Sequence, residues 1–264
     1  MTWTPIRRAL CGAAMLLALG SAAEAGVART WVGSSGNDSN TATNCTRAAP
    51  CKTFAAAYSV TQSGGEIVAL DSVGYGPITI TTPLTIIGLE GAFVSVQSNT
   101  TGITINSGAS VVLRNIQISG AAGSSNTIGI QVNSGKLLLR NSTLSRLTTG
   151  LSIAAGRADV IDTEISNNTT GVSTTGTGVD PQTLPITGNT LVRISYGDVI
   201  NNTTAYFMAD PGVGKYTILL RLQGNSAADI TTNQTGNTTM VAGSGASCPC
   251  TAVGNYSNAV NYNY

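Results

Sequence analysis

Apolar and polar residues alternate in short runs along most of the chain, and Gly, Asn, Ser and Thr separate the runs. Ile103-Thr104-Ile105 and Ile116-Gln117-Ile118 are two such runs. Alternation with a period of two is typical of strands that bury one face. Runs of three to five residues bury too little surface to fold alone. The pattern therefore predicts short strands that are stabilised by neighbouring copies of themselves.

The runs belong to a longer repeat. Segments of similar pattern begin at Gly102, Gly129, Gly150 and Gly171, with intervals of 27, 21 and 21 residues. The longer interval contains a loop insertion around 120–125. Each copy continues with a second and a third apolar element, so it holds three short strands. A stack of three-strand copies with inward ladders of Ile, Val and Leu is the layout of a parallel β-helix.

One polar residue follows the second strand of each copy. Asn115, Asn141 and Asp162 occupy this equivalent position. Asn and Asp tolerate a left-handed backbone, and Asn can hydrogen-bond along a stack. We interpret the three residues as a turn ladder, in preference to a functional site.

The repeat extends over residues 66–230, which leaves room for about seven coils at a rise of about 4.8 Å each. Both ends of such a stack need a cover. Lys52–Val60 is the best helix candidate, with residues 63–65 ending it, and Phe54, Ala57 and Tyr58 share one face. We assign residues 26–65 to an N-terminal cap with this helix, and residues 231–264 to a C-terminal cap or tail.

The first 25 residues have the pattern of a signal peptide. Arg7 and Arg8 precede an apolar stretch from Ala9 to Gly20, and Ala23-Glu24-Ala25 offers a small-x-small cleavage site. An apolar stretch of about 12 residues is too short to span a bilayer. We expect cleavage near Ala25 and an exported product without a membrane span, which is secreted, periplasmic or at the cell surface.

The charge of the chain excludes several functions. It has 13 basic residues, 12 acidic residues and no histidine. Removal of Arg7, Arg8 and Glu24 leaves a formal charge of zero, which argues against a nucleic-acid partner. Without histidine, no imidazole base or imidazole metal ligand is available. We expect no metal site and no cofactor.

Four cysteines remain after cleavage, and an exported compartment favours their pairing. Cys45 and Cys51 close a small loop and are the expected disulfide. Cys248 and Cys250 form a possible second pair, although the ring would be strained. A redox role for that pair is less favoured than a structural one, and zinc binding by all four is less favoured still.

Three segments resemble the opening of a known family. Pro50 to Ala57, Gly64 to Leu70 and Ile78 to Gly88 resemble the capping helix and first coil of secreted pectin-lyase-like right-handed β-helix proteins. The likeness covers about residues 29–230 and implies a right-handed, single-stranded parallel β-helix. The family contains lyases, hydrolases, epimerases, adhesins and members without known activity, so the resemblance implies the fold and not one reaction.

Catalytic motifs of this family do not carry over. Val160-Ile161-Asp162-Thr163 resembles a lyase segment, but Thr163 stands where the lyases tend to have histidine. The polygalacturonase motifs are not present as a set. Enzymatic activity is therefore left open and not favoured.

The residues themselves offer two weaker candidate sites. Asp159, Asp162 and Glu164 lie near Arg140 or Arg157. Asp162 and Glu164 are two residues apart, so on one strand they would point to the same face. Paired carboxylates can act as general acid and base or bind Ca²⁺. A solvated outer face, with Arg140 beside Asp162, is the favoured interpretation, because exposed ion pairs are common and weakly coupled. Aromatic residues that could stack on sugar rings, or pack in the core or cap, are Tyr196, Tyr206, Phe207 and Tyr216.

Two functions are consistent with these observations. The favoured one is a non-catalytic, exported β-helix that binds glycan or acts as a surface-interaction scaffold. The alternative is a divergent polysaccharide lyase or hydrolase acting on uronate-type polymers through Asp162 and Glu164, with Ca²⁺ as a cofactor in that case alone. A homo-oligomer is compatible with the sequence but not indicated by it.

Overall fold

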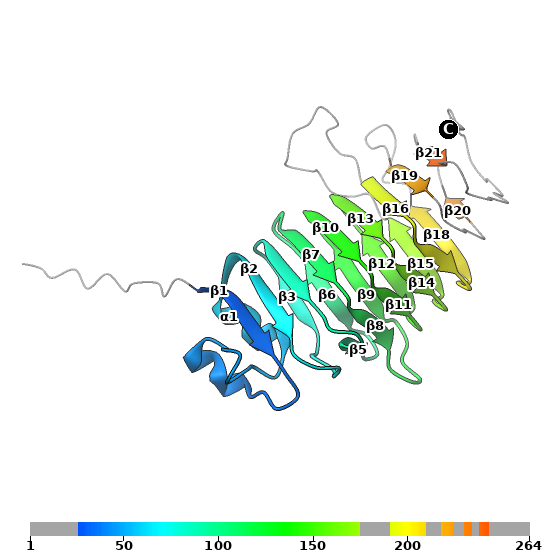
Figure 1. The fold of residues 1–264 in the computed structure, drawn as a ribbon. Coiled ribbons are helices and arrows are strands. Elements are labelled where there is room, and N and C mark those ends of the chain that lie inside the picture. The colour runs from blue at the N-terminus through cyan, green and yellow to red at the C-terminus, as the bar shows by residue number, and fades with distance from the viewer. Residues whose placement is uncertain (1–25, 175–190, 210–217, 224–229, 234–237, 243–264) are drawn as a thin grey trace, which may run out of the picture.

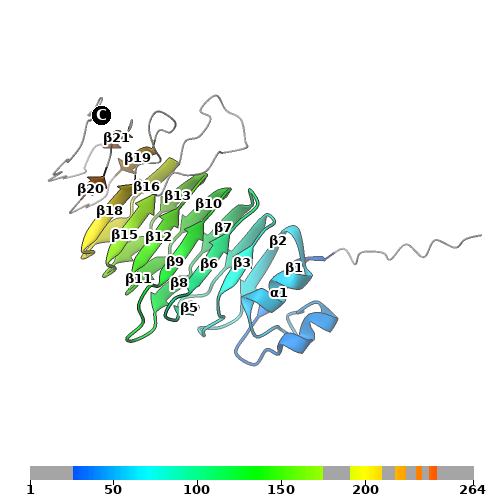
Figure 2. The same ribbon diagram turned by 180° about the vertical axis from the view of Figure 1, so that it is seen from behind.

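The computed structural model describes residues 26–174, 191–209, 218–223, 230–233 and 238–242. The chain is mostly β and forms three parallel sheets, with few helices (Figures 1 and 2). The prediction of an all-β fold made of parallel strands is confirmed.

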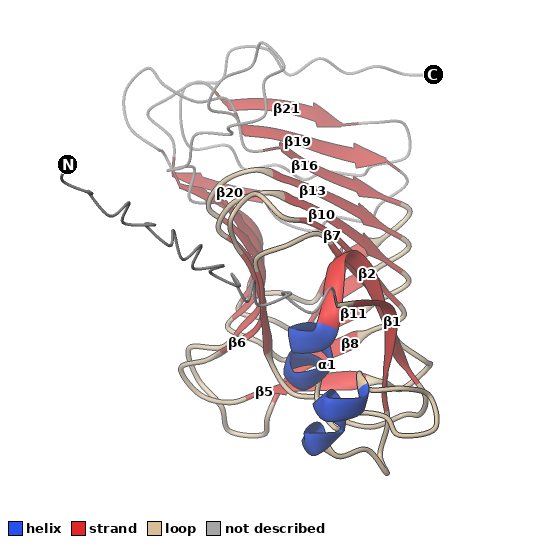
Figure 3. Cartoon of the chain, turned by 90° about the vertical axis from the view of Figure 1, so that its left-hand side faces the viewer, coloured by secondary structure: helices blue, strands red, loops and turns tan. Residues whose placement is uncertain are grey.

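The nine-stranded sheet, sheet A, runs along the whole described chain. Its strands, in order across the sheet, are β1 (Val27–Val32), β2 (Thr61–Ala69), β4 (Leu84–Ile87), β7 (Ser110–Arg114), β10 (Lys136–Arg140), β13 (Arg157–Ile161), β16 (Leu191–Ser195), β19 (Ile218–Gln223) and β21 (Thr238–Ala242). Figure 3 shows them one above another on one flank of the molecule.

The two other sheets are shorter. Sheet B consists of β5 (Phe93–Val96), β8 (Gln117–Gly120), β11 (Thr143–Ser145), β14 (Glu164–Ser166) and β17 (Asp198–Ile200). Sheet C consists of β3 (Ile78–Ile80), β6 (Thr101–Ile105), β9 (Ile128–Val132), β12 (Thr149–Ile153), β15 (Thr170–Thr174), β18 (Thr204–Ala209) and β20 (Ile230–Asn233). From β4 to β18 the chain visits sheets A, B and C in turn, so each repeat contributes one strand to each sheet.

The strands pair in register from one repeat to the next, which stacks like residues on like. Leu113 lies opposite Leu139, and Leu139 lies opposite Val160, all three fully buried. Sheet B stacks Ile118, Leu144 and Ile165 in the same way. Side chains from all three sheets belong to one hydrophobic cluster. The predicted ladders of Ile, Val and Leu therefore form the core.

The glycines that begin the repeats also stack, and the space around them explains why no side chain is present. A Cβ on Gly129 would lie 2.5 Å from the carbonyl oxygen of Gly150. A Cβ on Gly150 would lie 2.7 Å from the carbonyl oxygen of Gly171. These distances are far below van der Waals contact, so glycine is required for the repeats to approach one another.

The N-terminal end contains the predicted helix, α1 (Phe54–Val60), and a 3-10 helix, η1 (Asp38–Thr43). The Thr53 hydroxyl caps α1 by accepting from the Ala56 N–H at 3.1 Å. Phe54 and Ala57 are buried, as their shared face predicts. The predicted helix end at residues 63–65 is wrong, because β2 begins at Thr61 and contains those residues.

The sequence pattern also missed a strand at this end. Residues Val27–Val32 form β1, the outermost strand of sheet A beside β2. Its buried positions include the polar Thr30, while the apolar Trp31 beside it is only half-buried, so the apolar–polar pattern does not indicate the strand. The predicted disulfide between Cys45 and Cys51 is confirmed, and both residues are fully buried. Their backbone bonds to Trp31, so the closed loop covers part of the β1 edge.

An aspartate connects this end to the first turn after β2. The Asp71 carboxylate accepts from the Ser34 N–H at 2.8 Å and from the hydroxyls of Ser34 and Tyr75. Burial acts to raise the pKa of Asp71, but these hydrogen bonds outweigh it and lower the pKa below its usual value. Burial and the bond to Asp71 together raise the pKa of Tyr75 well above its usual range.

Some predictions fall on other parts of the chain. Residues 1–25, Cys248 and Cys250 lie outside the described residues, as does nearly all of the predicted C-terminal cap. In the described ranges, no helix is long and apolar enough to cross a membrane.

Replacing a stacked glycine tests the close approach of the repeats. Gly129→Ala places a methyl group against the backbone of Gly150 and should lower the free energy of unfolding by about 1–3 kcal/mol. Urea denaturation measures the loss. Gly33→Ala is the matched control, because its Cβ would meet its nearest atom, Pro50 Cγ, at an ordinary 3.4 Å. Equal stability of the two variants would contradict the close stacking.

Acid should weaken the contacts of Asp71. A carboxyl whose pKa is lower in the folded state stabilises the fold above its unfolded pKa, and this contribution disappears as the pH falls through the folded pKa. We expect Asp71→Asn to be less stable than the parent at pH 7, and the difference to narrow steadily below about pH 4. Urea midpoints measured across this range check the trend. A difference that is constant with pH would refute it.

Candidate functional site

The corner at which the chain passes from sheet A to sheet B has the same backbone turn in successive repeats. Asn115, Asn141 and Asp162 all have a left-handed backbone there, with φ of 55°, 47° and 50°. The prediction that they hold equivalent turn positions is confirmed. Tyr196, with φ of 55°, takes the same position after β16. The sequence repeat did not assign Tyr196 to this column, because its residue type differs from the other three.

The residue that follows each of these turns faces inward. Ser142 donates its hydroxyl to the Arg140 carbonyl at 2.7 Å and accepts from the Ile116 N–H at 3.3 Å. Thr163 donates its hydroxyl to the Ile161 carbonyl at 2.9 Å and is 2% exposed. Thr163 stands where the lyase segment has histidine, and its buried side chain holds the turn. This position therefore offers no group for chemistry at the surface.

A second polar column runs beside the turn column, on the outer face of sheet B. Strand pairing places Gln117 opposite Thr143, Thr143 opposite Glu164, and Glu164 opposite Asp198. Neighbours in this column are about 4.8 Å apart, the spacing of paired strands. We call the two columns together the corner strip; its residues are Asn115, Asn141, Asp162, Tyr196, Gln117, Thr143, Glu164 and Asp198.

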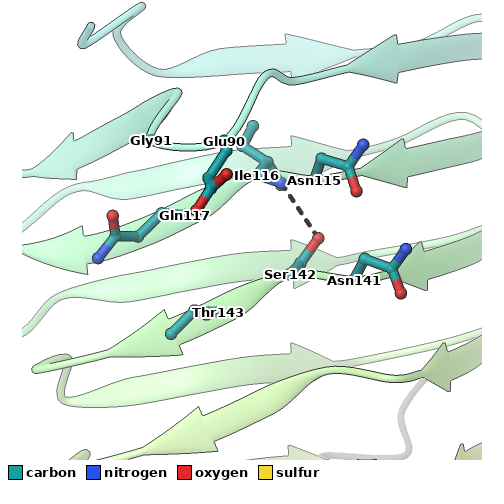
Figure 4. Close-up of a pocket in the computed structure, with 8 residues that line it drawn as sticks. All are labelled: Glu90, Gly91, Asn115, Ile116, Gln117, Asn141, Ser142 and Thr143. Carbon is teal, nitrogen blue, oxygen red and sulfur yellow. Dashed lines mark hydrogen bonds between the residues drawn. The ribbon is translucent and has the colours of Figure 1, made fainter. Parts of the chain in front are cut away.

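One end of the corner strip is hollowed into a groove of about 530 Å³. Its walls come from the turn before β5 and from the beginnings of β8 and β11; the lining residues are Glu90, Gly91, Asn115, Ile116, Gln117, Asn141, Ser142 and Thr143. Figure 4 shows Glu90 and Gln117 on one side and the two asparagines on the other. The Ser72 hydroxyl bonds to the Glu90 carbonyl and so holds the turn that carries the carboxylate.

The groove brings together groups that recognise hydroxyl-rich ligands. Asn115, Asn141 and Gln117 each carry an amide that both donates and accepts, and all three are exposed. Glu90 adds an exposed carboxylate that accepts only. No feature of the sequence predicted the groove itself. Its one signal was the polar residue two positions after each turn asparagine, which recurs as Gln117 and Thr143.

The predicted carboxylate cluster is divided between two places. Asp162 lies in the corner turn, while Glu164 begins β14; the expectation that they share one strand is wrong, because the left-handed turn separates them. Both are exposed on the corner strip. Asp159 lies instead on the outer face of sheet A, where it pairs with Arg157 at 2.7 Å and with Arg193 at 3.7 Å.

Arg140 does not take the place expected for it beside Asp162. It is exposed at the end of β10, and its partner in β13 is Ile161. Within the described ranges, no ion pair joins Arg140 to Asp162. Glu164 is held by the Ser166 hydroxyl, which donates to it at 2.5 Å.

The predicted aromatic residues are separated as well. Tyr196 is 64% exposed and lies on the corner strip. Tyr206 is in β18 at the register position of Val172, and Phe207 follows it opposite Ser173. The side chains of both, and the whole of Tyr216, lie outside the described residues.

In the part of the chain that the structure describes, no group of three or more His, Cys, Asp or Glu side chains could hold a metal ion.

Comparison of the chain with protein-family models, with curated proteins and with solved structures gives no match. Its function must therefore be argued from the corner strip and from the surfaces beside it.

Proposed function

We propose that the chain is a right-handed, single-stranded parallel β-helix of about seven coils that works outside the cytoplasm after removal of residues 1–25. The repeated visits to sheets A, B and C, in register, support the helical path. The signal-peptide pattern and the Cys45–Cys51 disulfide support export.

We further propose that the protein is a non-catalytic glycan-binding protein, and that the groove of the corner strip holds the sugar. The observation that carries this proposal is the concentration of amides and one carboxylate around a cavity of about 530 Å³. Sugar hydroxyls both donate and accept, and amide side chains match them in both senses. Gln117 lies in β8, and Asn115 and Asn141 lie in short turns held between paired strands, so little conformational entropy is lost when a ligand binds.

The corner strip continues beyond the groove, which suits an extended ligand. From Asn141 the turn column leads to Asp162 and then to Tyr196. The exposed Tyr196 ring offers an apolar face on which a sugar ring can stack. A glycan chain along the strip would therefore meet amides first, then carboxylates, and then an aromatic ring.

Loss of one groove amide should weaken glycan binding. Gln117→Ala removes a side chain from the groove wall, and one hydrogen bond of about 0.5–1.5 kcal/mol corresponds to a loss of roughly two- to tenfold in affinity. Binding to an array of neutral and acidic polysaccharides, followed by titration calorimetry, measures it. Gln131→Ala is the matched control, since Gln131 faces outward from sheet C. An equal loss in both variants, or no binding to any polysaccharide, would contradict the assignment.

The contribution of Tyr196 can be tested without disturbing its turn. Tyr196→Asn keeps a residue that tolerates the left-handed backbone but removes the ring. We expect longer oligosaccharides to lose affinity by roughly two- to tenfold, because an aromatic contact contributes about 0.5–1.5 kcal/mol beyond the area it buries. Oligosaccharides short enough to fill the groove alone should bind unchanged. Titration calorimetry with a series of oligosaccharides of increasing length separates the two cases.

A second candidate function is supported by the acidic part of the strip. Glu164 and Asp198 lie opposite each other on paired strands, with Asp162 at the neighbouring turn. Strands about 4.8 Å apart place carboxyl groups near the separation of about 5–5.5 Å used by retaining glycosidases. A divergent hydrolase acting on uronate-type polymers would use this pair as nucleophile and general acid–base, and a lyase would use it as base and acid. Alternatively, the pair would hold Ca²⁺ with oxygen ligands from the substrate.

Activity on uronate polymers decides this alternative. Under it, Glu164→Gln should lower kcat by about 100-fold or more, because general acid–base catalysis contributes at least that much. Asp159→Asn is the control, since that carboxylate is paired on sheet A and should leave kcat unchanged. Product formation by ultraviolet absorbance and reducing-end assay measures both. Full activity in Glu164→Gln would exclude Glu164 from the reaction.

A further inference from the structure

The charged side chains are segregated by face, although the formal charge of the chain without its leader is zero. The outer face of sheet A between β7 and β16 carries five cations and, among the described residues, one carboxylate, Asp159. The cations are Arg114, Lys136, Arg140, Arg157 and Arg193. Of the acidic residues near this face, Asp162 lies in the corner turn and Glu90 in the turn before β5, while Glu164 and Asp198 lie beyond the corner on sheet B. We call the outer face of sheet A between β7 and β16, with these five cations and the side chains between them, the basic face.

Four of these cations form two rows. Arg114 lies directly opposite Arg140, and Lys136 lies directly opposite Arg157. Lys136 and Arg140 are four residues apart on one strand, so they share a face and are separated by about 13 Å. The rows therefore run along sheet A, in the direction in which the repeats stack in Figure 3.

The space between the rows is apolar. Val112 and Leu138 lie opposite each other there and are half-buried on the outer face. The next residue in their column is Asp159, which pairs with both Arg157 and Arg193. The basic face thus combines cations at both margins with aliphatic side chains in the middle.

Most of this positive charge is not compensated within the described residues. Arg114, Lys136 and Arg140 have no carboxylate within 4.0 Å there, in contrast to Arg29, which pairs with Glu66 on the same sheet. Like charges directly opposite each other on paired strands destabilise a sheet. A stack of Arg114 on Arg140 is consistent with an anionic partner that compensates them.

We propose that the basic face docks on an anionic lipid surface and contacts its phosphate headgroups. The sheet is broad, and its strands lie side by side with little change of direction (Figures 1 and 3). A single polymer chain could follow one row of cations, whereas a planar layer of phosphates meets both rows at once. The aliphatic side chains between the rows suit the boundary below the headgroups. This interaction is distinct from glycan binding at the corner strip and does not depend on it.

Vesicle binding by the full mature chain tests the proposal. The protein should sediment with phosphatidylcholine vesicles that contain phosphatidylglycerol, and not with phosphatidylcholine alone. Binding should be lost near 1 M salt, where the Debye length falls to about 3 Å. Equal binding to both vesicle types, or binding that is insensitive to salt, would overturn the proposal.

Variants that remove one or two arginines test whether the basic face makes the contact with the vesicle. Arg140→Gln should weaken partition into anionic vesicles about fivefold, and Arg114→Gln with Arg140→Gln about 25-fold. Arg47→Gln changes the net charge equally at an exposed position in the disulfide loop and should have no effect. Thermal unfolding confirms that the variants remain folded. An equal loss in Arg47→Gln would show that net charge and not this face is responsible.

Two further measurements separate the possible partners. If dextran sulfate binds with the same dependence on Arg114 and Arg140 while anionic vesicles do not bind, the partner is a soluble polyanion and the lipid assignment fails. Gln117→Ala should leave vesicle binding unchanged. A loss of glycan binding in that variant therefore reports on the proposed groove alone, and the two proposals can fail independently.

Discussion

In-register parallel pairing between strands one repeat apart determines both the interior and the surface of this molecule. It places Leu113 on Leu139 and Leu139 on Val160, so each repeat buries its apolar face against copies of the same face. A shift of one residue would turn every one of these side chains outward. The glycines at 129 and 150 allow the close approach that the pairing needs, since a Cβ at either would meet the backbone of the next repeat.

The same pairing arranges the polar residues into columns. A residue type that recurs at an outward position becomes a row of groups about 4.8 Å apart. At the corner between sheets A and B this produces the turn column and the column from Gln117 to Asp198. On sheet A it produces the rows of cations. The chemistry of the surface therefore changes from one column to the next, while within a column it changes slowly along the stack.

Much of the fold could be predicted from the sequence, because short strands in a regular repeat can bury their apolar faces in few arrangements. The glycine phase, the apolar ladders, the turn position of Asn115 and Asn141, and the Cys45–Cys51 disulfide were all found in this way. The strand Val27–Val32 was missed, because its buried face carries the polar Thr30 while the apolar Trp31 is half-buried on the other face. The start of β2 at Thr61 was missed because its glycines look like a helix end. They are instead part of a strand, with Gly64 at φ of 79°.

The candidate site was less predictable, for a geometric reason. Spacing along the chain implied that Asp162 and Glu164 share a strand, but a left-handed residue breaks the period of two, and Asp162 is that residue. Asp159, three positions earlier, consequently faces a different side and is already paired with arginines. The groove depends on Glu90 meeting Gln117 across repeats, which requires knowledge of the register as well as of the repeat.

The formal charge of zero also cannot be interpreted without the register. The total charge argues against a polyanionic partner, and that argument would hold for a protein whose charges are randomly distributed. Here each outward column belongs to one face, so cations that recur at the ends of β7 and β10 add up on sheet A, and acids at the start of β14 and β17 add up on sheet B. Because the Debye length is about 8 Å at physiological salt, a partner on one face is largely screened from charges on the other. The local charge of a face, and not the total, is therefore the quantity that decides what a stacked repeat protein can bind.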